Sequence, residues 1–457
     1  MKQSFSYDKL LDNAKKIHMI GIGGSGMCPL AEILYHKGYL ITGSDRGENT
    51  STRRLSNMGI EISIGHKAEN IQGCDLVAYS AAIPDDNPEL IAANELDIPT
   101  MERSCLLGAV SRKFNNVIGV CGTHGKTTVT SLITHIMIKA GLEPNALIGG
   151  RLPLTNTNGV VGSSEIFVCE SCEYVDTFLQ ISPDIAVLLN IDNDHLEYFK
   201  TMENLTASFR KFIGFAHTAF VNGDDERFAE VTRGIKSDVI TFGLKDTNDY
   251  YPFNIQKGKF GYCYDVYHNG EKIGSVDCTI PGKHNIYNSL VAFAVCYNQG
   301  VEAELIKDAI SSFTGAGRRF ELIGEYNGFT LVDDFAHHPT EIKATLKAAK
   351  GLEFNRVIVV FQPYTYSRTA MLKDEFIEAL SIADNVILTP INAAREINTY
   401  GIDSEYIRNG LKDAVIVDGF ENIADKILEM ANPGDLVITM GGGDIYKSAY
   451  IIRERFI

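Results

Sequence analysis

Residues 116–128 read NVIGVCGTHGKTT, and this stretch decides the fold class of the chain. The apolar run 116–121 is typical of a buried strand, and residues 127–140 after the loop predict a helix. Glycines let backbone N–H groups turn towards phosphates, and a helix N-terminus adds partial positive charge. The order strand, glycine loop, helix therefore predicts a nucleotide-binding α/β domain.

The loop carries side chains suited to ATP. We expect Lys126 to reach the β- and γ-phosphates and the Thr127 hydroxyl to ligate Mg²⁺. The pattern departs from G-x-x-x-x-G-K-[ST], since Val120 stands at the first glycine position. The alternative is a tight turn with a surface lysine. The predicted ATP-binding residues of the loop are Gly122, Thr123, His124, Gly125, Lys126, Thr127 and Thr128.

A second glycine loop, GIGGSG at residues 21–26, follows the predicted strand 16–22. It matches G-x-G-x-x-G, and Asp45 stands at the end of the next strand, where a ribose-binding acid is expected. The pattern indicates a phosphorylated ligand at a helix N-terminus but does not separate NAD from a UDP-sugar. A glycine turn without a ligand is the alternative.

Polar residues also follow two later strands. Glu170 ends the strand 166–169, where a Mg²⁺ ligand is expected beside a phosphate loop. The stretch NIDNDH, 190–195, follows the strand 186–189, and its oxygen and nitrogen ligands suit a second metal. The alternatives are a solvated acid at Glu170 and a structural histidine at His195.

Further amides and cations lie nearer the C-terminus. Asn285 and Asn288 are three residues apart, hence on one helical face, and suit either a nucleotide base or a helix cap. The pair Arg318-Arg319 suits a transferring phosphoryl group or a solvated hinge. Arg368 ends the stretch QPYTYSR and is suited to bind a carboxylate with two hydrogen bonds.

Composition excludes several classes of partner. The 457 residues carry a formal net charge of -16, which argues against nucleic-acid and anionic-membrane partners, since both need basic patches. Residues 1–16 do not resemble a signal peptide, and no apolar run approaches the roughly 20 residues of a membrane span. Of nine cysteines only Cys169 and Cys172 form a C-x-x-C, without a second pair at zinc spacing. Free thiols suit a reducing compartment, so we expect a cytoplasmic protein.

Short β-branched runs alternate with longer amphipathic ones, which is typical of α/β proteins. Predicted parallel sheets begin at residues 16–22, 116–121 and 329–332. We therefore predict three domains, at 1–107, 108–317 and 318–457.

The motifs, taken in order, resemble those of the Mur ligases over nearly the whole chain. This resemblance implies an N-terminal Rossmann-like domain for a UDP-sugar, a central P-loop-type ATPase with a mainly parallel sheet, and a C-terminal Rossmann-like domain for the amino acid. The motifs are the glycine loop at 21–26, GTHGKTT at 122–128, ESCE at 170–173, NIDNDH at 190–195, PGKHNIYN at 281–288, GRRF at 317–320, DDFAHHPTE at 333–341 and FQPYTYSRT at 361–369.

The resemblance implies an activity as well. The match is closest to members that join L-alanine to the lactyl carboxylate of UDP-N-acetylmuramate through an acyl phosphate, consuming ATP with two Mg²⁺ sites. We expect these small molecules as partners and a monomer or weak homodimer. Tyr364 and Thr365 stand where members commonly carry His and often Arg, which leaves the amino-acid pocket open.

The resemblance also distributes roles among the candidate residues. It implies that the catalytic residues are Lys126, Glu170, His195 and Arg319. It implies that the metal ligands are Thr127, Glu170 and His195. Further contacts to the nucleotide are expected from Asn285, Asn288, Arg319 and Asp334. The predicted substrate-binding residues are Gly21, Gly23, Gly24, Ser25, Gly26, Met27, Ser44, Asp45 and Ser80 for the UDP-sugar and Arg368 for the amino acid.

Three alternative functions remain at this point. An NAD-dependent dehydrogenase explains the loop at 21–26 but leaves Lys126 unexplained. A P-loop switch or motor leaves the third domain without a task. A sister ligase that attaches a recycled tripeptide shares every motif.

Overall fold

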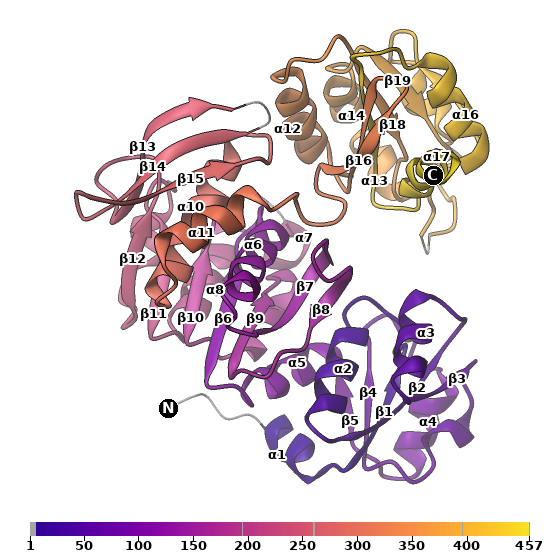
Figure 1. Ribbon diagram of the computed structural model, residues 1–457. Coiled ribbons are helices and arrows are strands. Elements are labelled where there is room, and N and C mark those ends of the chain that lie inside the picture. The colour runs from indigo at the N-terminus through magenta and orange to yellow at the C-terminus, as the bar shows by residue number, and fades with distance from the viewer. Residues whose placement is uncertain (1–5, 194, 259–260, 395, 457) are drawn as a thin grey trace. The chain divides into compact units, whose positions relative to one another are not determined.

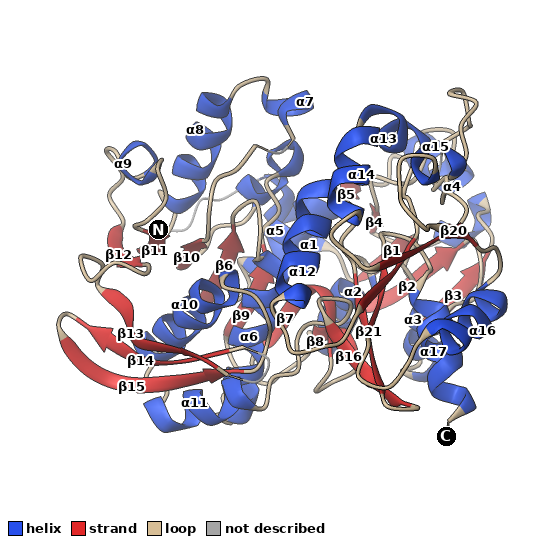
Figure 2. Cartoon of the chain, turned by 90° about the horizontal axis from the view of Figure 1, so that it is seen from above, coloured by secondary structure: helices blue, strands red, loops and turns tan. Residues whose placement is uncertain are grey.

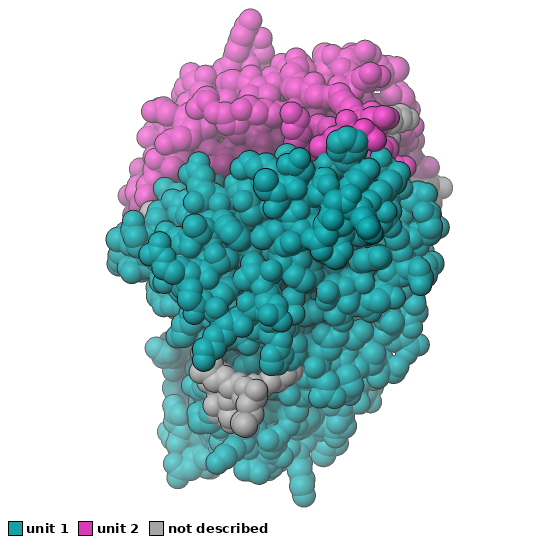
Figure 3. Space-filling view, turned by 90° about the vertical axis from the view of Figure 1, so that its left-hand side faces the viewer, with its two compact units in different colours: residues 1–253, 265–275, 287–309 teal, residues 254–264, 276–286, 310–457 magenta. Residues whose placement is uncertain are grey.

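The computed structural model describes residues 6–193, 195–258, 261–394 and 396–456. The chain divides into two compact units, coloured separately in Figure 3. The first unit comprises residues 1–253, 265–275 and 287–309, and the second comprises 254–264, 276–286 and 310–457.

The first sheet has five parallel strands in the order β3-β2-β1-β4-β5. The strand order reverses between β1 and β4, and ligands of such sheets bind where it reverses. β1 stops two residues short of the predicted 16–22 strand, because Gly21 turns the chain with φ 73°. Figure 1 shows this sheet in indigo with its helices around it. The elements are β1 Lys16–Ile20, β2 Leu40–Asp45, β3 Glu61–Ile64, β4 Leu76–Tyr79, β5 Thr100–Glu102, α1 Ser6–Asn13, α2 Cys28–His36, α3 Thr50–Asn57, η1 Ala68–Ile71, α4 Pro88–Glu95 and α5 Arg103–Ser111.

The second sheet has ten strands in the order β15-β14-β13-β12-β11-β10-β6-β9-β7-β8. β6 pairs in parallel with both β9 and β10, so the loops that follow these three strands lie at one edge. The sequence did not predict β13, β14 and β15, which run side by side in Figures 1 and 2. The strands are β6 Asn116–Cys121, β7 Asn145–Leu152, β8 Thr157–Val160, β9 Ile166–Glu170, β10 Ile185–Leu188, β11 Thr218–Asn222, β12 Asp238–Phe242, β13 Tyr250–Lys257, β14 Tyr262–His268 and β15 Glu271–Cys278.

The helices of this part follow from the same alternation of strand and helix. α6 begins at the glycine loop, and its mostly buried residues match a helix packed within a domain. Thr201 caps α8 by accepting a hydrogen bond from the Asn204 N–H. The helices are α6 Lys126–Lys139, η2 Tyr174–Gln180, α7 Leu196–Phe199, α8 Met202–Ile213, α9 Phe228–Val231, α10 His284–Asn298 and α11 Ala303–Ser311.

The third sheet has the order β16-β17-β21-β18-β19-β20. Its strands are parallel except β16, which forms a hairpin with β17. The strands predicted for this sheet are the parallel ones, and β16 was not predicted from the sequence. Asn327 and Gly328 both have positive φ, at 48° and 84°, as a two-residue hairpin turn requires. The elements are β16 Glu321–Tyr326, β17 Phe329–Asp334, β18 Val357–Phe361, β19 Asn385–Leu388, β20 Val415–Ile416, β21 Leu436–Met440, α12 Pro339–Lys350, α13 Tyr366–Met371, α14 Lys373–Leu380, α15 Glu405–Arg408, α16 Phe420–Met430 and α17 Tyr446–Arg455.

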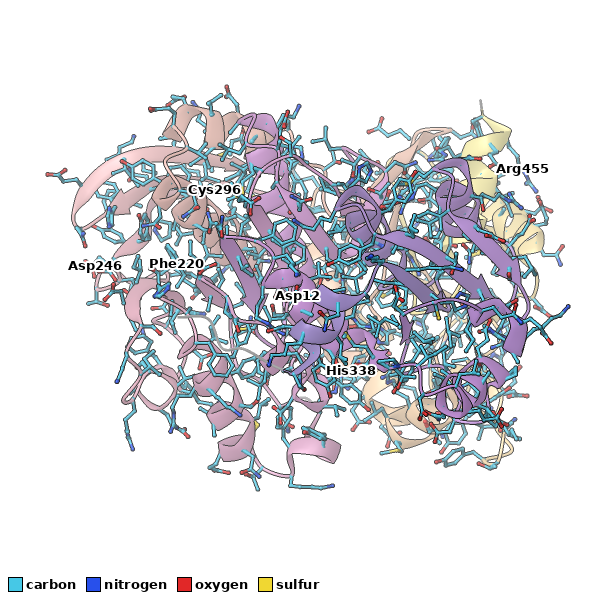
Figure 4. The ribbon with its side chains drawn as sticks, turned by 90° about the horizontal axis from the view of Figure 1, so that it is seen from below. Asp12, Phe220, Asp246, Cys296, His338 and Arg455 are labelled. Carbon is cyan, nitrogen blue, oxygen red and sulfur yellow. The ribbon has the colours of Figure 1, made fainter. Side chains whose placement is uncertain are left out.

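Apolar residues of the strands and helices form the cores of both units. Phe220 on β11 and Cys296 on α10, labelled in Figure 4, are fully buried in the first unit. Cys169 is buried and Cys172 exposed, and both are free thiols. Among the described residues, no helix is long and apolar enough to cross a membrane.

Candidate active site

The phosphate loop follows β6 and leads directly into α6. Gly122 and Gly125 have φ of 131° and 88°, a region that side chains rarely adopt. A Cβ at Gly125 would also lie 2.7 Å from Asn288 Oδ1. Glycine is therefore required at Gly125 on both counts.

The segment after β10 fixes this loop. Thr123 N–H donates to the Asn190 carbonyl at 3.0 Å, and His124 N–H donates to Asn190 Oδ1 at 2.8 Å. The Asp192 N–H donates to the Thr123 hydroxyl at 2.9 Å, and His124 Nε2 lies 3.1 Å from Asp192 Oδ2. Asn190, whose role the sequence analysis missed, therefore positions the loop.

Lys126, the first residue of α6, is held by four acceptors. Its ammonium donates to the carbonyls of Gly122 and Thr123 at 2.6 and 3.1 Å, and to Glu173 Oε1 and Oε2 at 3.1 and 2.9 Å. Burial lowers the pKa of Lys126, but the Glu173 carboxylate outweighs burial and leaves that pKa above its usual value. Lys126 is therefore a largely buried, charged group at the phosphate loop.

Thr127 and Glu170 form a second pair beside the first. The Thr127 hydroxyl donates to Glu170 Oε2 at 2.9 Å, and the Gly149 N–H donates to the same oxygen at 2.9 Å. The two predicted metal ligands are thus brought together. Thr128 is partly exposed on the first turn of α6.

His195, the third predicted metal ligand, is half-buried and has a positive φ of 55°. Its ring centroid lies 4.8 Å from that of Tyr174. Asp194, part of the same motif, lies outside the described residues. Among the described residues, no group of three or more His, Cys, Asp or Glu side chains could hold a metal.

Asn285 and Asn288 are both buried in the first turns of α10. The Asn285 amide donates to the Pro281 carbonyl at 2.8 Å, four residues earlier in the chain. Asn288 reaches the phosphate loop, as its Oδ1 is the atom that excludes a side chain at Gly125.

The first glycine loop leaves β1 and is fastened to the end of β2. The N–H groups of Gly21 and Ile22 donate to the Ser44 carbonyl at 2.8 and 3.1 Å. Gly23 N–H donates to Asp45 Oδ2 at 2.9 Å, and Gly24 N–H donates to the Gly21 carbonyl at 3.0 Å. Asp45 therefore shapes the loop itself.

Arg103 lies against the far end of this loop and was not predicted. A Cβ at Gly26 would lie 3.1 Å from Arg103 Cδ. The Ser25 carbonyl accepts a hydrogen bond from the Asn158 amide, and Met27 is buried. Ser80, at the end of β4, accepts from the Ala82 N–H at 3.3 Å. The predicted residues around the loop thus gather where β1, β2 and β4 end.

The Ser44 hydroxyl points away from the loop into a buried polar cluster. It donates to Glu89 Oε2 at 2.7 Å, and His66 Nδ1 lies 2.9 Å from the same oxygen. The Asn70 amide donates to Glu89 Oε1 at 2.5 Å. His18 Nε2 lies 3.5 Å from the same carboxylate. Burial raises the pKa of Glu89, but hydrogen bonds from these partners outweigh it and lower the pKa to about 2.

In the second unit, the two arginines of the GRRF motif have different surroundings. Arg318 binds Asp333 at 2.8 Å and donates to the Gly443 and Gly441 carbonyls at 2.8 and 2.7 Å. Arg319 is partly exposed, and its NH1 is 4.0 Å from Glu341. Arg318 is therefore a structural anchor, and Arg319 has the freer guanidinium.

Asp334 ends β17 in a buried position. Its carboxylate accepts from the N–H groups of Phe320 and Ala336, both at 2.8 Å. Burial raises the pKa of Asp334 to about 6, although Arg319 acts in the opposite direction.

Two buried polar atoms, one directly after β18 and one on α13, have no hydrogen-bond partner among the described residues. They are NH1 of Arg368 and Oε1 of Gln362. Gln362 Oε1 lies against Gly443, where a Cβ would come within 2.3 Å of it. A buried donor or acceptor left unpaired is costly, so each of these atoms is suited to pair with a ligand group. Gln362 could have been inferred from its place two residues after Val360 at the end of a buried strand.

Family models cover most of the chain. Residues 16–115 match the model described as the Mur ligase family, catalytic domain, residues 120–296 match the Mur ligase middle domain, and residues 318–443 match the Mur ligase, glutamate ligase domain.

Individual relatives agree with these models. The UDP-N-acetylmuramate–L-alanine ligase of Caldicellulosiruptor saccharolyticus is 45% identical over 96% of this chain and 98% of that protein. The enzyme of the same name from Caldanaerobacter subterraneus subsp. tengcongensis is 44% identical over 98% of both.

Solved structures show the same fold. The UDP-N-acetylmuramate-alanine ligase of Thermotoga maritima has a TM-score of 0.82 and 27% identity, covering 96% of this chain and 99% of that one. A murein peptide ligase from Psychrobacter arcticus has a TM-score of 0.71 at 24% identity, covering 96% and 98%. On this evidence the chain belongs to the Mur ligase family.

Proposed function

We propose that this chain joins L-alanine to the lactyl carboxylate of UDP-N-acetylmuramate at the expense of ATP, a step of peptidoglycan precursor synthesis. Relatives named for this reaction are 44–45% identical over almost the whole chain. The observation that carries the chemistry is the phosphate loop, where Lys126 and Thr127 begin a helix and face Glu173 and Glu170.

Forming an amide from a carboxylate and an amine is unfavourable in water, so the carboxylate must be activated. ATP transfers its γ-phosphoryl group to give an acyl phosphate and ADP, and the amine then attacks the carbonyl and releases phosphate. Two anions meet in the first step. Lys126 would neutralise their charge, and by the family resemblance Arg319 would contact the phosphates and Asp334 the nucleotide.

Thr127 and Glu170 fit a magnesium ion, because Mg²⁺ prefers oxygen ligands and keeps several waters and phosphate oxygens. Bound there, the ion would spread the negative charge of the phosphates. A second ion at His195 would complete its ligands with water and phosphate, since the protein supplies no cage among the described residues.

The UDP-sugar is assigned to the first glycine loop. Its phosphates would approach the loop just before α2, where the helix dipole favours an anion. Arg103 adds a cation beside Gly26. The Ser44 hydroxyl is engaged with Glu89, so Ser44 contributes through its carbonyl, which holds the loop.

The amino acid is assigned to the loop after β18. Arg368 is a fork-shaped cation suited to the carboxylate, and Gln362 Oε1 is an acceptor suited to the ammonium. Each atom would gain the partner that it lacks when an α-amino acid binds there.

An ADP-release assay with UDP-N-acetylmuramate and a panel of amines tests this function. We expect L-alanine to be preferred over glycine by roughly 10–200-fold in kcat/KM, since one methyl group in an apolar pocket supplies about that factor. L-Serine should compete better than glycine. A higher kcat/KM for L-Ala-γ-D-Glu-meso-diaminopimelate than for L-alanine would make this chain a recycling ligase.

A further inference from the structure

The proposed ligation does not by itself require the contact between Lys126 and Glu173. An ammonium has three protons, and Lys126 already faces four acceptors within 3.1 Å. A phosphate oxygen can therefore reach Lys126 only by replacing one of them.

Glu173 is the acceptor that a phosphate would replace. The two carbonyls belong to Gly122 and Thr123, in the same loop as Lys126, and accompany it. Glu173 comes from the separate segment after β9 and is 1% exposed. Among the described residues, Lys126 is the donor found for its carboxylate. Carboxylate and phosphate are both anions, so they compete for one cation.

The turn that carries Glu173 is fixed in place. Val175 and Asp176 have positive φ, at 53° and 56°. The Asp176 carboxylate accepts from the Tyr198 hydroxyl at 3.0 Å and from the Ser208 hydroxyl. Glu173 therefore cannot readily follow Lys126 when the lysine turns to a ligand.

We propose that Glu173 is a positioning residue that holds Lys126 in the nucleotide-free site and competes with the terminal phosphates of ATP for its ammonium. This inference rests on the proposed function, because it takes Lys126 as the phosphate ligand. Glu173 keeps the buried lysine charged and in place, and it lowers the affinity for nucleotide, since binding leaves a buried carboxylate without its cation.

The test is calorimetric titration of the full chain with the non-hydrolysable analogue AMP-PNP and Mg²⁺. Glu173→Gln should bind AMP-PNP at least about tenfold more tightly, since a hydrogen bond to a charged group contributes roughly that factor. Glu173→Asp, whose shorter carboxylate retreats from Lys126, should show a smaller gain. Glu378→Gln, which removes the partner of Lys343 on α12, is the matched control and should change nothing.

A merely structural role for Glu173 predicts the opposite sign, because a disturbed loop binds nucleotide more weakly. Unchanged or weaker AMP-PNP binding by a folded Glu173→Gln or Glu173→Asp variant overturns the proposal. The gain must also vanish when Glu173→Gln is made in a Lys126→Ala background, and a gain that persists there overturns it as well. Absence of any nucleotide binding by the unaltered chain would instead contradict the proposed function.

Discussion

The Thr127 hydroxyl donates a 2.9 Å hydrogen bond to Glu170 Oε2, although 43 residues separate the two in the chain. Parallel pairing of β6 with β9 explains the contact, because both strands end at the same edge of the sheet. The Gly149 N–H holds the same oxygen, so the carboxylate is oriented before any cation binds. Such pre-orientation of ligands favours metal binding.

Glu170→Gln should raise the Mg²⁺ concentration for half-maximal rate by at least roughly 10–100-fold, the usual cost of losing a residue that only hydrogen-bonds a metal ligand. The amide keeps the shape of the side chain but removes its charge. Magnesium titration of ADP release measures the effect. An unchanged titration would mean that Glu170 is a solvated loop acid and does not bind the metal.

His195→Ala should weaken the apparent Mg²⁺ dependence and lower kcat without unfolding the chain. The side chain is half-buried and contacts the Tyr174 ring, so its removal leaves a small defect near the surface. Tyr174→Phe keeps the ring and serves as a control. If metal titration and rate are both normal in His195→Ala, the histidine is structural.

Gly26→Val should weaken UDP-N-acetylmuramate binding more than AMP-PNP binding. A Cβ at Gly26 already meets Arg103 at 3.1 Å, and the branched side chain would also block approach of a ligand to the loop backbone. Calorimetry with each ligand gives the two dissociation constants. Equal losses would point to general misfolding.

Arg368→Lys should raise the KM for L-alanine by about tenfold or more with little change for ATP, because lysine cannot make the paired hydrogen bonds of a guanidinium. Arg408→Lys on α15 is a control at an exposed arginine. An equal rise in both KM values would remove Arg368 from the amino-acid site.

Glu89→Gln should destabilise the chain in a pH-dependent way. Folding lowers the pKa of Glu89 from 4.5 to about 2. A carboxyl with a lowered pKa stabilises the fold above its unfolded pKa, and this contribution is lost as the pH falls through the folded pKa. At pH 7 it amounts to about 3 kcal/mol, at 1.36 kcal/mol for each pKa unit.

Urea unfolding at pH 7, 5 and 3 checks this expectation. The difference in unfolding free energy between the unaltered chain and Glu89→Gln should be largest at pH 7 and should shrink below about pH 4. A difference that is constant with pH would mean that the charge of Glu89 contributes nothing and that the variant only disturbs packing.

Much of this protein was determined by local sequence. Strand β6, the loop of Gly122 to Thr128 and helix α6 follow from an apolar run, glycines and a helical period, which are properties of neighbouring residues. The first glycine loop and the alternation of strand and helix have the same origin. Strand β16 was not predicted, and a two-residue turn at Asn327 and Gly328 sets its antiparallel direction.

Other features were decided only by tertiary structure. Sequence spacing did not distinguish the roles of Arg318 and Arg319. In the structure Arg318 donates to the carbonyls of Gly441 and Gly443, which are distant in the sequence, whereas Arg319 stays partly exposed. The ion pair of Lys126 with Glu173 likewise joins segments far apart in the chain, and so does the hydrogen bond from the Ser44 hydroxyl to Glu89. Residue type fixes which bonds a side chain can make, but sheet pairing decides which donors and acceptors come within reach.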